Sequence, residues 1–277
     1  MTTFIGCDKP YDSADTVIFG APFDSTTSYR PGTRFASRTM RAESYGLETY
    51  SPYLDRDLSE TAICDLGELE LCFGDTQAAL ADIEAQTAKI LSDGKRPVMI
   101  GGEHLVSLGA IHAAAKQYPD LHIIHFDAHT DLRDDYLGVK LSHATVMRRA
   151  WDILGDGRIF QYGIRSGDRL EFQWAAEGHV QMSKFDFAGL KETVFHLHDK
   201  PVYFSIDLDV LDPSVFPGTG TPEAGGVSFL ELLGAIFEVC RLRIVAADVN
   251  ELSPVYDPTG ASTAVANKVL RELLLAL

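Results

Sequence analysis

The sequence has no long hydrophobic run. No apolar stretch approaches the roughly 20 residues that span a bilayer, and residues 1–16 show no basic segment followed by an apolar one. These absences exclude a membrane-spanning class and give no sign of export or of an anchor. We therefore expect a cytoplasmic protein that does not act on membranes.

Cysteine and positive charge are also scarce. Lys and Arg number 24 against 40 Asp and Glu, which gives a formal net charge of −16. Nucleic-acid binding needs clustered cations, so this balance excludes it. No two cysteines form a CxxC pair, which excludes a zinc knuckle and a thioredoxin-like motif. The four lie far apart, at Cys7, Cys64, Cys72 and Cys240.

Short hydrophobic runs rich in β-branched residues alternate with longer helical patterns. Such runs are typical of strands covered on both faces, and the alternation favours a mostly parallel sheet. The clearest strands are predicted at residues 16–23, 96–103, 122–129, 158–165, 202–209 and 243–252. Weaker strands are predicted at 64–71 and 179–185, and helices at 75–94, 105–117 and 228–240.

These elements predict a single domain. Ser228 and Glu231 have the spacing of a capping box at the start of one helix, and Gly94 closes another. No linker or repeat divides the chain. We therefore predict one α/β domain spanning residues 1–277, with three αβα layers and a mostly parallel sheet of about eight strands.

Polar residues gather where three predicted strands end. The segments are GGEH at 101–104, DAHTD at 127–131 and DLDVLDP at 207–213. Ligands of open parallel sheets sit beyond the carboxyl ends of the strands, so these segments are expected to meet. Because alternate side chains of an extended chain share a face, Asp127, His129 and Asp131 should point the same way. The same holds for Asp207 and Asp209.

A group of buried aspartates needs compensating charge. One aspartate after a strand is usually a turn former or a helix cap. Four carboxylates at one buried edge would repel each other and lose hydration, at a cost on the order of several kcal/mol per ion. Two divalent cations offset four such charges, and oxygen ligands mixed with imidazole suit Mn²⁺. We therefore predict two Mn²⁺ ions per chain as cofactors.

Seven segments of the chain, in order, also carry a family resemblance. They are GAPFDSTTSYRPGTRFAS, GGEH, FDAHTD, SHATVMRR, GIRSGD, SIDLDVLDPSVFPGTGTPEAGG and ADVNELSPVYD. Together they resemble the ureohydrolases, the family of arginases and agmatinases, and are most similar to its agmatinases. The match covers nearly the whole chain, and FDAHTD combined with SIDLDVLDP is highly specific to this family.

The resemblance implies a pair of metal sites with shared ligands. One manganese would be held by His104, Asp127, Asp131 and Asp207, and the other by Asp127, His129, Asp207 and Asp209. Asp127 and Asp207 would bridge the two ions. The family likeness also implies an eight-stranded parallel sheet and assembly into a homo-oligomer, a trimer or a hexamer.

The implied activity is hydrolysis of a small guanidino compound. A guanidinium carbon is deactivated by resonance, and two metals sharing a water lower the pKa of that water, so a metal-bridging hydroxide is expected to attack the carbon. The leaving amine must be protonated, and Asp131 is the expected donor. By resemblance, His143 shuttles protons to solvent, a task that suits an ordinary imidazole pKa near 6.5, and Glu251 binds the guanidinium.

The substrate tail distinguishes the members of the family. Arginases have an asparagine, two residues before the histidine that matches His143, which helps to bind the α-carboxylate of arginine; here that residue is Leu141. This departure disfavours arginine. The prediction is hydrolysis of agmatine to putrescine and urea, in polyamine biosynthesis. The alternatives are another guanidino substrate, such as guanidinobutyrate or arginine, and an inactive relative that only binds metal.

Other polar residues receive no site role at this point. His125 lies deeper in its strand than Asp127, so a buried, hydrogen-bonded role is expected for it. Asp248 matches a family position to which no role is assigned, and Glu223 is equally well explained as a turn residue. The arginines of these motifs, including Arg165, are expected to form ordinary ion pairs rather than an anion site.

Overall fold

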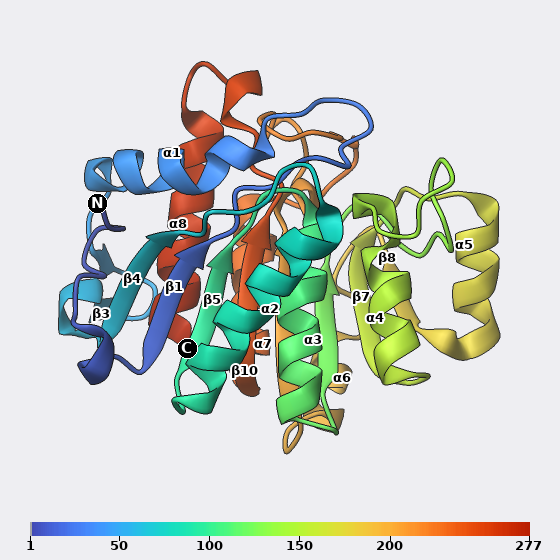
Figure 1. The fold of residues 1–277 in the computed structure, drawn as a ribbon, viewed down its shortest axis with the longest axis horizontal. Coiled ribbons are helices and arrows are strands. Elements are labelled where there is room, and N and C mark those ends of the chain that lie inside the picture. Colours follow the sequence, from blue (N-terminus) through green and yellow to red (C-terminus); the bar gives the residue numbers. More distant parts are fainter. Residues whose placement is uncertain (1) are drawn as a thin grey trace.

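A computed structural model describes residues 2–277. Its centre is an eight-stranded sheet in the order β4-β1-β5-β10-β9-β6-β7-β8, with every neighbouring pair parallel (Figure 1). The strands are β1 (Thr16–Gly20), β4 (Ile63–Glu68), β5 (Arg96–Ile100), β6 (His122–Phe126), β7 (Ile159–Ile164), β8 (Gln181–Lys184), β9 (Pro201–Asp207) and β10 (Arg243–Asn250). All eight predicted strands are confirmed, and the two weaker predictions form the edges β4 and β8.

Helices cover both faces of this sheet. The mutually packed helices α2, α3 and α4 lie on one face, and α1, α6, α7 and α8 lie on the other (Figure 1). The helices are α1 (Ala36–Glu43), α2 (Thr76–Ser92), α3 (Ser107–Gln117), α4 (Val146–Leu154), α5 (Arg169–Trp174), α6 (Leu190–His196), α7 (Phe229–Val239) and α8 (Ala261–Ala276). The three-layer αβα prediction is confirmed. None of the helices within residues 2–277 is long and apolar enough to cross a membrane.

Strand side chains alternate between two hydrophobic cores. On β9, Tyr203 packs into the core beneath α2, α3 and α4, whereas Phe204 packs into the core beneath α7 and α8. On β6, Ile123 and Ile124 divide in the same way. Because both faces are buried, these strands are hydrophobic along nearly their whole length.

Helix ends follow local sequence signals. The Asp75 side chain caps α2 by accepting a hydrogen bond from the backbone N–H of Ala78, and Gly94 follows this helix at a φ of 73°. Ser228 and Glu231 form the expected capping box at the start of α7. These contacts satisfy backbone groups that a helix end leaves without partners.

One hairpin lies outside the large sheet. It pairs β2 (Tyr50–Ser51) with β3 (Arg56–Asp57) in antiparallel orientation and packs beside α8. It was not predicted, because each strand is only two residues long and shows no alternating pattern.

Candidate metal centre

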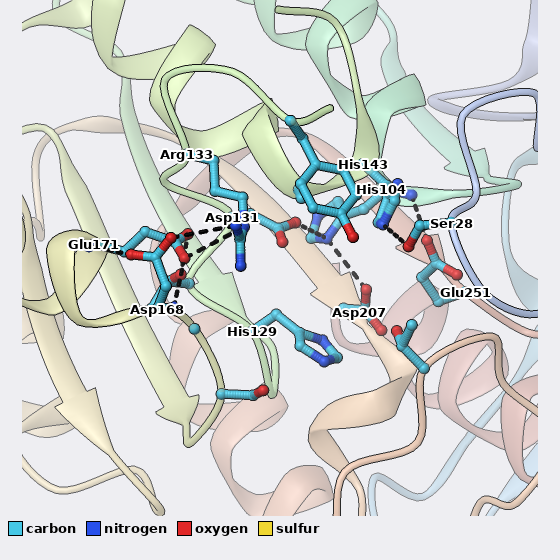
Figure 2. Close-up of a pocket in the computed structure, with 16 residues that line it drawn as sticks. Ser28, His104, His129, Asp131, Arg133, His143, Asp168, Glu171, Asp207 and Glu251 are labelled. Atoms are coloured by element: carbon cyan, nitrogen blue, oxygen red, sulfur yellow. Dashed lines mark hydrogen bonds and ion pairs between the residues drawn. The ribbon is translucent and has the colours of Figure 1, made fainter. Parts of the chain in front are cut away.

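The predicted segments meet at the carboxyl ends of four central strands. His104 lies in the turn after β5, Asp127 follows β6, Asp207 ends β9 and Glu251 follows β10. Figure 2 shows His104, Asp207 and Glu251 around the same open space. This is the edge at which open parallel sheets bind their ligands.

The turns after the strands, rather than the alternation of side chains along a strand, orient the candidate ligand side chains. β6 ends at Phe126, so His129 and Asp131 lie in the loop beyond it, and Asp131 has a positive φ of 52°. Asp209 lies in a 3-10 turn directly after β9. The expected strand parity was therefore wrong, because these residues lie beyond the strands. The loop backbone nevertheless brings the same side chains together.

One group of possible ligands surrounds His104. Its Nδ1 lies 3.0 Å from Oδ2 of Asp127, 3.3 Å from Oδ2 of Asp131 and 3.2 Å from Oδ2 of Asp207. All four side chains are buried. Ligand atoms of His104, Asp127, Asp131 and the neighbouring His125 all lie within 4.8 Å of one another. A single cation could contact several of these atoms at once.

A second group shares Asp127 with the first. Nδ1 of His129 lies 3.0 Å from Oδ2 of Asp209 and 3.4 Å from Oδ1 of Asp127. Asp127 thus offers Oδ2 to the first group and Oδ1 to the second, which is the arrangement of a bridging carboxylate. Asp207 offers Oδ2 to the first group, and its Oδ1 accepts the backbone N–H of Asp209 at 2.8 Å. Its bridging role stays a prediction.

Two observations test whether these residues fit metal ions. Oδ2 of Asp209 is buried and accepts no hydrogen bond within residues 2–277, although it faces Nδ1 of His129. Burial, followed by the charge of Asp127, raises the pKa of Asp131 to about 7. Burial and the neighbouring Asp209 raise the pKa of Asp207 well above its usual range. An orphan oxygen and two carboxylates that resist ionisation are what divalent cations would stabilise.

A buried hydrogen-bond chain orients His104. Oγ of Ser205 donates to Oδ1 of Asp248 at 2.7 Å, so it accepts from Nε2–H of His104 at 2.9 Å. In the neutral imidazole that a metal requires, Nδ1 then carries no hydrogen and faces the carboxylates. Asp248, which had no predicted role, therefore fixes the tautomer of His104 through Ser205. Their strands β10 and β9 are adjacent, with Asp248 paired to Ser205 in register.

Both ring nitrogens of His125 have hydrogen-bond partners, and one of these partners is Asp127. The amide nitrogen of Gln161 lies 2.7 Å from the carbonyl oxygen of Thr130, which fixes the amide orientation, and 3.0 Å from Nδ1 of His125. Nδ1 is therefore an acceptor, and Nε2–H donates to Oδ2 of Asp127 at 2.9 Å. The expected hydrogen-bonded role of His125 agrees with these contacts.

A polar cavity of about 250 Å³ opens above the two groups. Glu251 lines it and is only 6% exposed, and its backbone has a positive φ of 67°. Its Oε1 accepts the backbone N–H of His104 at 2.7 Å. Burial, followed by the charge of Asp209, raises its pKa well above the usual range. An acid held this way would pair strongly with a cation entering the cavity.

His143 lines the opposite side of the cavity. Its Nδ1 donates to the carbonyl oxygen of Thr26 at 2.9 Å, which leaves Nε2 free of hydrogen and 3.2 Å from Oγ of Ser28. Burial lowers the pKa of His143 to about 4. The expectation of an ordinary pKa near 6.5 was therefore wrong, because the imidazole is largely desolvated. At neutral pH it is a proton acceptor.

Several polar residues at the centre were not predicted from the sequence. Arg165 donates to the backbone carbonyl groups of Asp209 at 2.7 Å and Glu223 at 2.8 Å, and so joins two loops of the site. The Glu223 side chain does not line the cavity. Near the mouth, Arg133 pairs with Asp168 at 3.2 Å (Figure 2). The motif spelling contains these residues, but it does not reveal which of them meet.

Leu141 points away from the cavity. It packs against the hydrophobic core beneath α2, α3 and α4, and it lines a separate surface hollow beside His112. Its side chain is not part of the cavity lining.

Two groups of possible metal ligands share Asp127 and lie below a polar cavity at the end of a parallel sheet, which is typical of a binuclear metallohydrolase. The chain belongs to the arginase family, whose family model matches residues 14–276. The family resemblance inferred from the sequence motifs is thereby confirmed.

Individual relatives match along most of their length. The agmatinase of Bacillus subtilis (strain 168) is 48% identical over 275 residues, which cover 98% of this chain and 95% of that protein. The guanidinobutyrase of Pseudomonas aeruginosa is 32% identical, over 96% of this chain and 87% of that protein. The solved agmatine ureohydrolase of Thermoplasma volcanium superposes with a TM-score of 0.91 at 35% identity, covering 100% and 94% of the two chains.

Proposed function

We propose that this protein hydrolyses agmatine to putrescine and urea. The observation that carries the proposal is the joint presence of both ligand groups and Glu251, a buried acid that faces the cavity outside either group. A metal site with a purely structural role needs no such acid. The enzyme is therefore a hydrolase of a guanidino C–N bond.

Sequence similarity supports agmatine among the guanidino compounds. Four proteins named agmatinase are 46–48% identical to this chain over 98% of its length, whereas the guanidinobutyrase is 32% identical. The position of Leu141 outside the cavity also supports a substrate without a carboxylate. Near the cavity mouth, Arg133 is paired with Asp168 and lies 3.6 Å from Glu171, so acids outnumber this cation. Such a mouth favours an ammonium tail over a carboxylate tail.

We assign the roles of the site residues on the same grounds. His104, Asp127, His129, Asp131, Asp207 and Asp209 would hold the metal pair. When bound, two divalent ions supply a hydroxide nucleophile at neutral pH by lowering the pKa of a shared water.

The remaining steps belong to three side chains. The carboxylate of Glu251 binds the guanidinium and holds its carbon in place. Oδ2 of Asp131 delivers a proton to the nitrogen of the leaving amine. Nε2 of His143, which is free of hydrogen, exchanges protons between the cavity and solvent.

We further propose Mn²⁺ as the metal, one domain spanning residues 1–277, and a homo-oligomer, a trimer or a hexamer, in the cytoplasm. The mixed oxygen and nitrogen ligand set supports manganese. The single eight-stranded sheet, with a hydrophobic core on each face, supports one domain. The oligomer, the location and a role in polyamine biosynthesis rest on the family alone, and light scattering of the purified protein tests the first of them.

Urea release from a substrate panel tests the proposal. The Mn²⁺-loaded enzyme should act on agmatine with a kcat/KM about 100-fold or more above that for arginine or guanidinobutyrate, because tail recognition discriminates strongly. Asp127→Ala should abolish release. A preference for guanidinobutyrate would identify a different ureohydrolase, and no urea from any of the three would indicate a metal-binding relative without turnover.

A further inference from the structure

Glu103 is a buried acid between β5 and α3 that none of the roles above uses. Its side chain is fully buried. Oε2 accepts hydrogen bonds from the backbone N–H of Thr26 at 3.0 Å and from Oγ1 of Thr27 at 2.9 Å, and Oε1 accepts from Oγ1 of Thr26 at 2.5 Å. A buried carboxylate is tolerated only with such donors. Glu103 therefore orients Thr26 and Thr27.

The other side of Thr26 holds His143. The hydroxyl hydrogen of Thr26 is donated to Glu103, so its oxygen is free to accept the backbone N–H of His143 at 3.0 Å. The Thr26 carbonyl oxygen accepts Nδ1–H of the same histidine at 2.9 Å. Both contacts join residues 117 positions apart. One threonine thus connects a buried acid to the imidazole that faces the cavity.

The backbone of this segment is anchored independently of Glu103. Oδ2 of Asp24 accepts the backbone N–H groups of Gly32 at 2.8 Å and Arg34 at 3.3 Å. At the other end, the segment packs directly on Gly102, where a Cβ atom would lie 1.9 Å from the carbonyl oxygen of Phe23. The particular contribution of Glu103 is therefore the orientation of Thr26, and not the general course of the loop.

We propose that Glu103 is a positioning residue for proton transfer: through Thr26 it holds His143 with Nδ1 protonated and Nε2 bare towards the cavity and Ser28. This proposal deepens the proposed function and rests on it. Glutamine at position 103 offers one acceptor oxygen in place of two. The Thr26 carbonyl would then no longer be fixed, and the imidazole could rotate or change tautomer.

The expected kinetic effect is on kcat rather than KM. Glu251 and the metal-binding side chains are unchanged by the substitution, so guanidinium binding and metal content should be retained. Proton exchange through His143 should slow. We expect Glu103→Gln and Thr26→Val each to lower kcat by about tenfold to a hundredfold, a part of what general acid–base groups contribute. KM should stay within about twofold.

Two matched variants control for structural damage. Thr26→Ser keeps the hydroxyl group and should restore kcat to within about threefold of the unmodified enzyme. Thr27→Val removes a hydrogen bond to Glu103 but does not contact His143, and its kcat should also stay within about threefold. If Glu103→Gln fails to fold, the comparison of Thr26→Val with Thr26→Ser still decides the proposal.

A double-mutant cycle separates positioning from stability. In a His143→Ala background, Glu103→Gln should cause no further loss of kcat, because the group that it positions is gone. If Glu103→Gln lowers kcat by the same factor in both backgrounds, or raises KM and releases metal with kcat unchanged, the proposal is overturned and Glu103 is only a structural anchor.

Histidine ¹⁵N spectra give a readout that does not depend on turnover. In protein loaded with a diamagnetic ion such as Zn²⁺, the resonances that His143→Ala removes should show Nδ1 protonated and Nε2 bare. Glu103→Gln should give a mixture of tautomers; an unchanged spectrum would overturn the proposal. If the unmodified chain releases no urea from any guanidino compound, the proposed function fails, whereas these spectra still decide the role of Glu103.

Discussion

In the proposed site, Glu251 lies between the metal pair and the cationic substrate. Its strained backbone, at a φ of 67°, and its contact with the backbone N–H of His104 tie it to the loop that carries a metal ligand. A positive φ in a residue other than glycine is costly and is concentrated at functional sites. The proposed role of Glu251, binding of the substrate guanidinium, can be tested directly by mutation.

Glu251→Gln keeps the shape of the side chain and removes its charge. Hydrogen bonds to charged groups contribute about 1.5–3 kcal/mol each, so the loss of a bidentate pair should lower kcat/KM by roughly 100-fold or more. Steady-state urea release measures this, with metal content determined in parallel. Glu223→Gln, whose side chain lies outside the cavity, is the matched control and should be unchanged. Full activity in Glu251→Gln contradicts the assigned role.

His143 gives a prediction for pH. Its pKa is lowered to about 4, so the neutral, accepting form is present above that pH and is lost as the pH falls through it. Its titration should therefore leave kcat flat between about pH 5.5 and 7.5. His143→Gln should lower kcat by about tenfold to a hundredfold across this whole range.

Metal content must be measured at each pH in this experiment, since acid also releases metal by protonating the ligands. An ionisation near pH 6.5 in the unmodified enzyme that disappears in His143→Gln would contradict the buried, neutral state of this residue.

At the scale of elements, the turns after the strands determine the site. The strands and the residues that meet at the candidate site could be predicted, because buried strands are hydrophobic and because Asp and His cluster in short motifs. The directions in which these side chains point could not be predicted. β6 and β9 end before most of these residues, so the alternation of side chains along a strand no longer applies to them. Contacts between distant segments, such as Asp248 with Ser205 or Glu103 with Thr26, depend on strand register and loop packing. Local sequence patterns do not specify which of these residues meet.

Gly102 tests the close packing of one of these turns. A Cβ atom there would lie 1.9 Å from the carbonyl oxygen of Phe23, and backbone atoms cannot move aside easily. Gly102→Ala should therefore lower the free energy of unfolding by about 3 kcal/mol or more. Gly234 is the control, since it lies within α7 with open space around it, and Gly234→Ala should raise that free energy by roughly 0.5–1 kcal/mol. Denaturant titration measures both, and equal effects would contradict the described packing.

At the scale of the whole molecule, the proposed metal pair would join segments at the ends of three central strands of one sheet, β5, β6 and β9. Metal binding to the folded state should therefore stabilise the entire chain. At 100 times the dissociation constant, binding adds about 2.7 kcal/mol, or roughly 5–10 °C in melting temperature for a chain of this size.

Calorimetry with and without EDTA measures this effect. We expect a single transition that moves to lower temperature when metal is removed, and no response to metal in Asp127→Ala. Two separate transitions would contradict the proposal of one domain over residues 1–277, and a melting temperature independent of metal would contradict the binuclear centre.

The most direct test of the central claim is anomalous diffraction at the manganese absorption edge from crystals of the active, Mn²⁺-loaded enzyme. The arrangement of the carboxylates predicts two anomalous peaks per chain, both in contact with Asp127 and Asp207, one beside His104 and the other beside His129. A single peak, or none, in crystals of enzyme that releases urea from agmatine would contradict a hydrolase built on a metal pair.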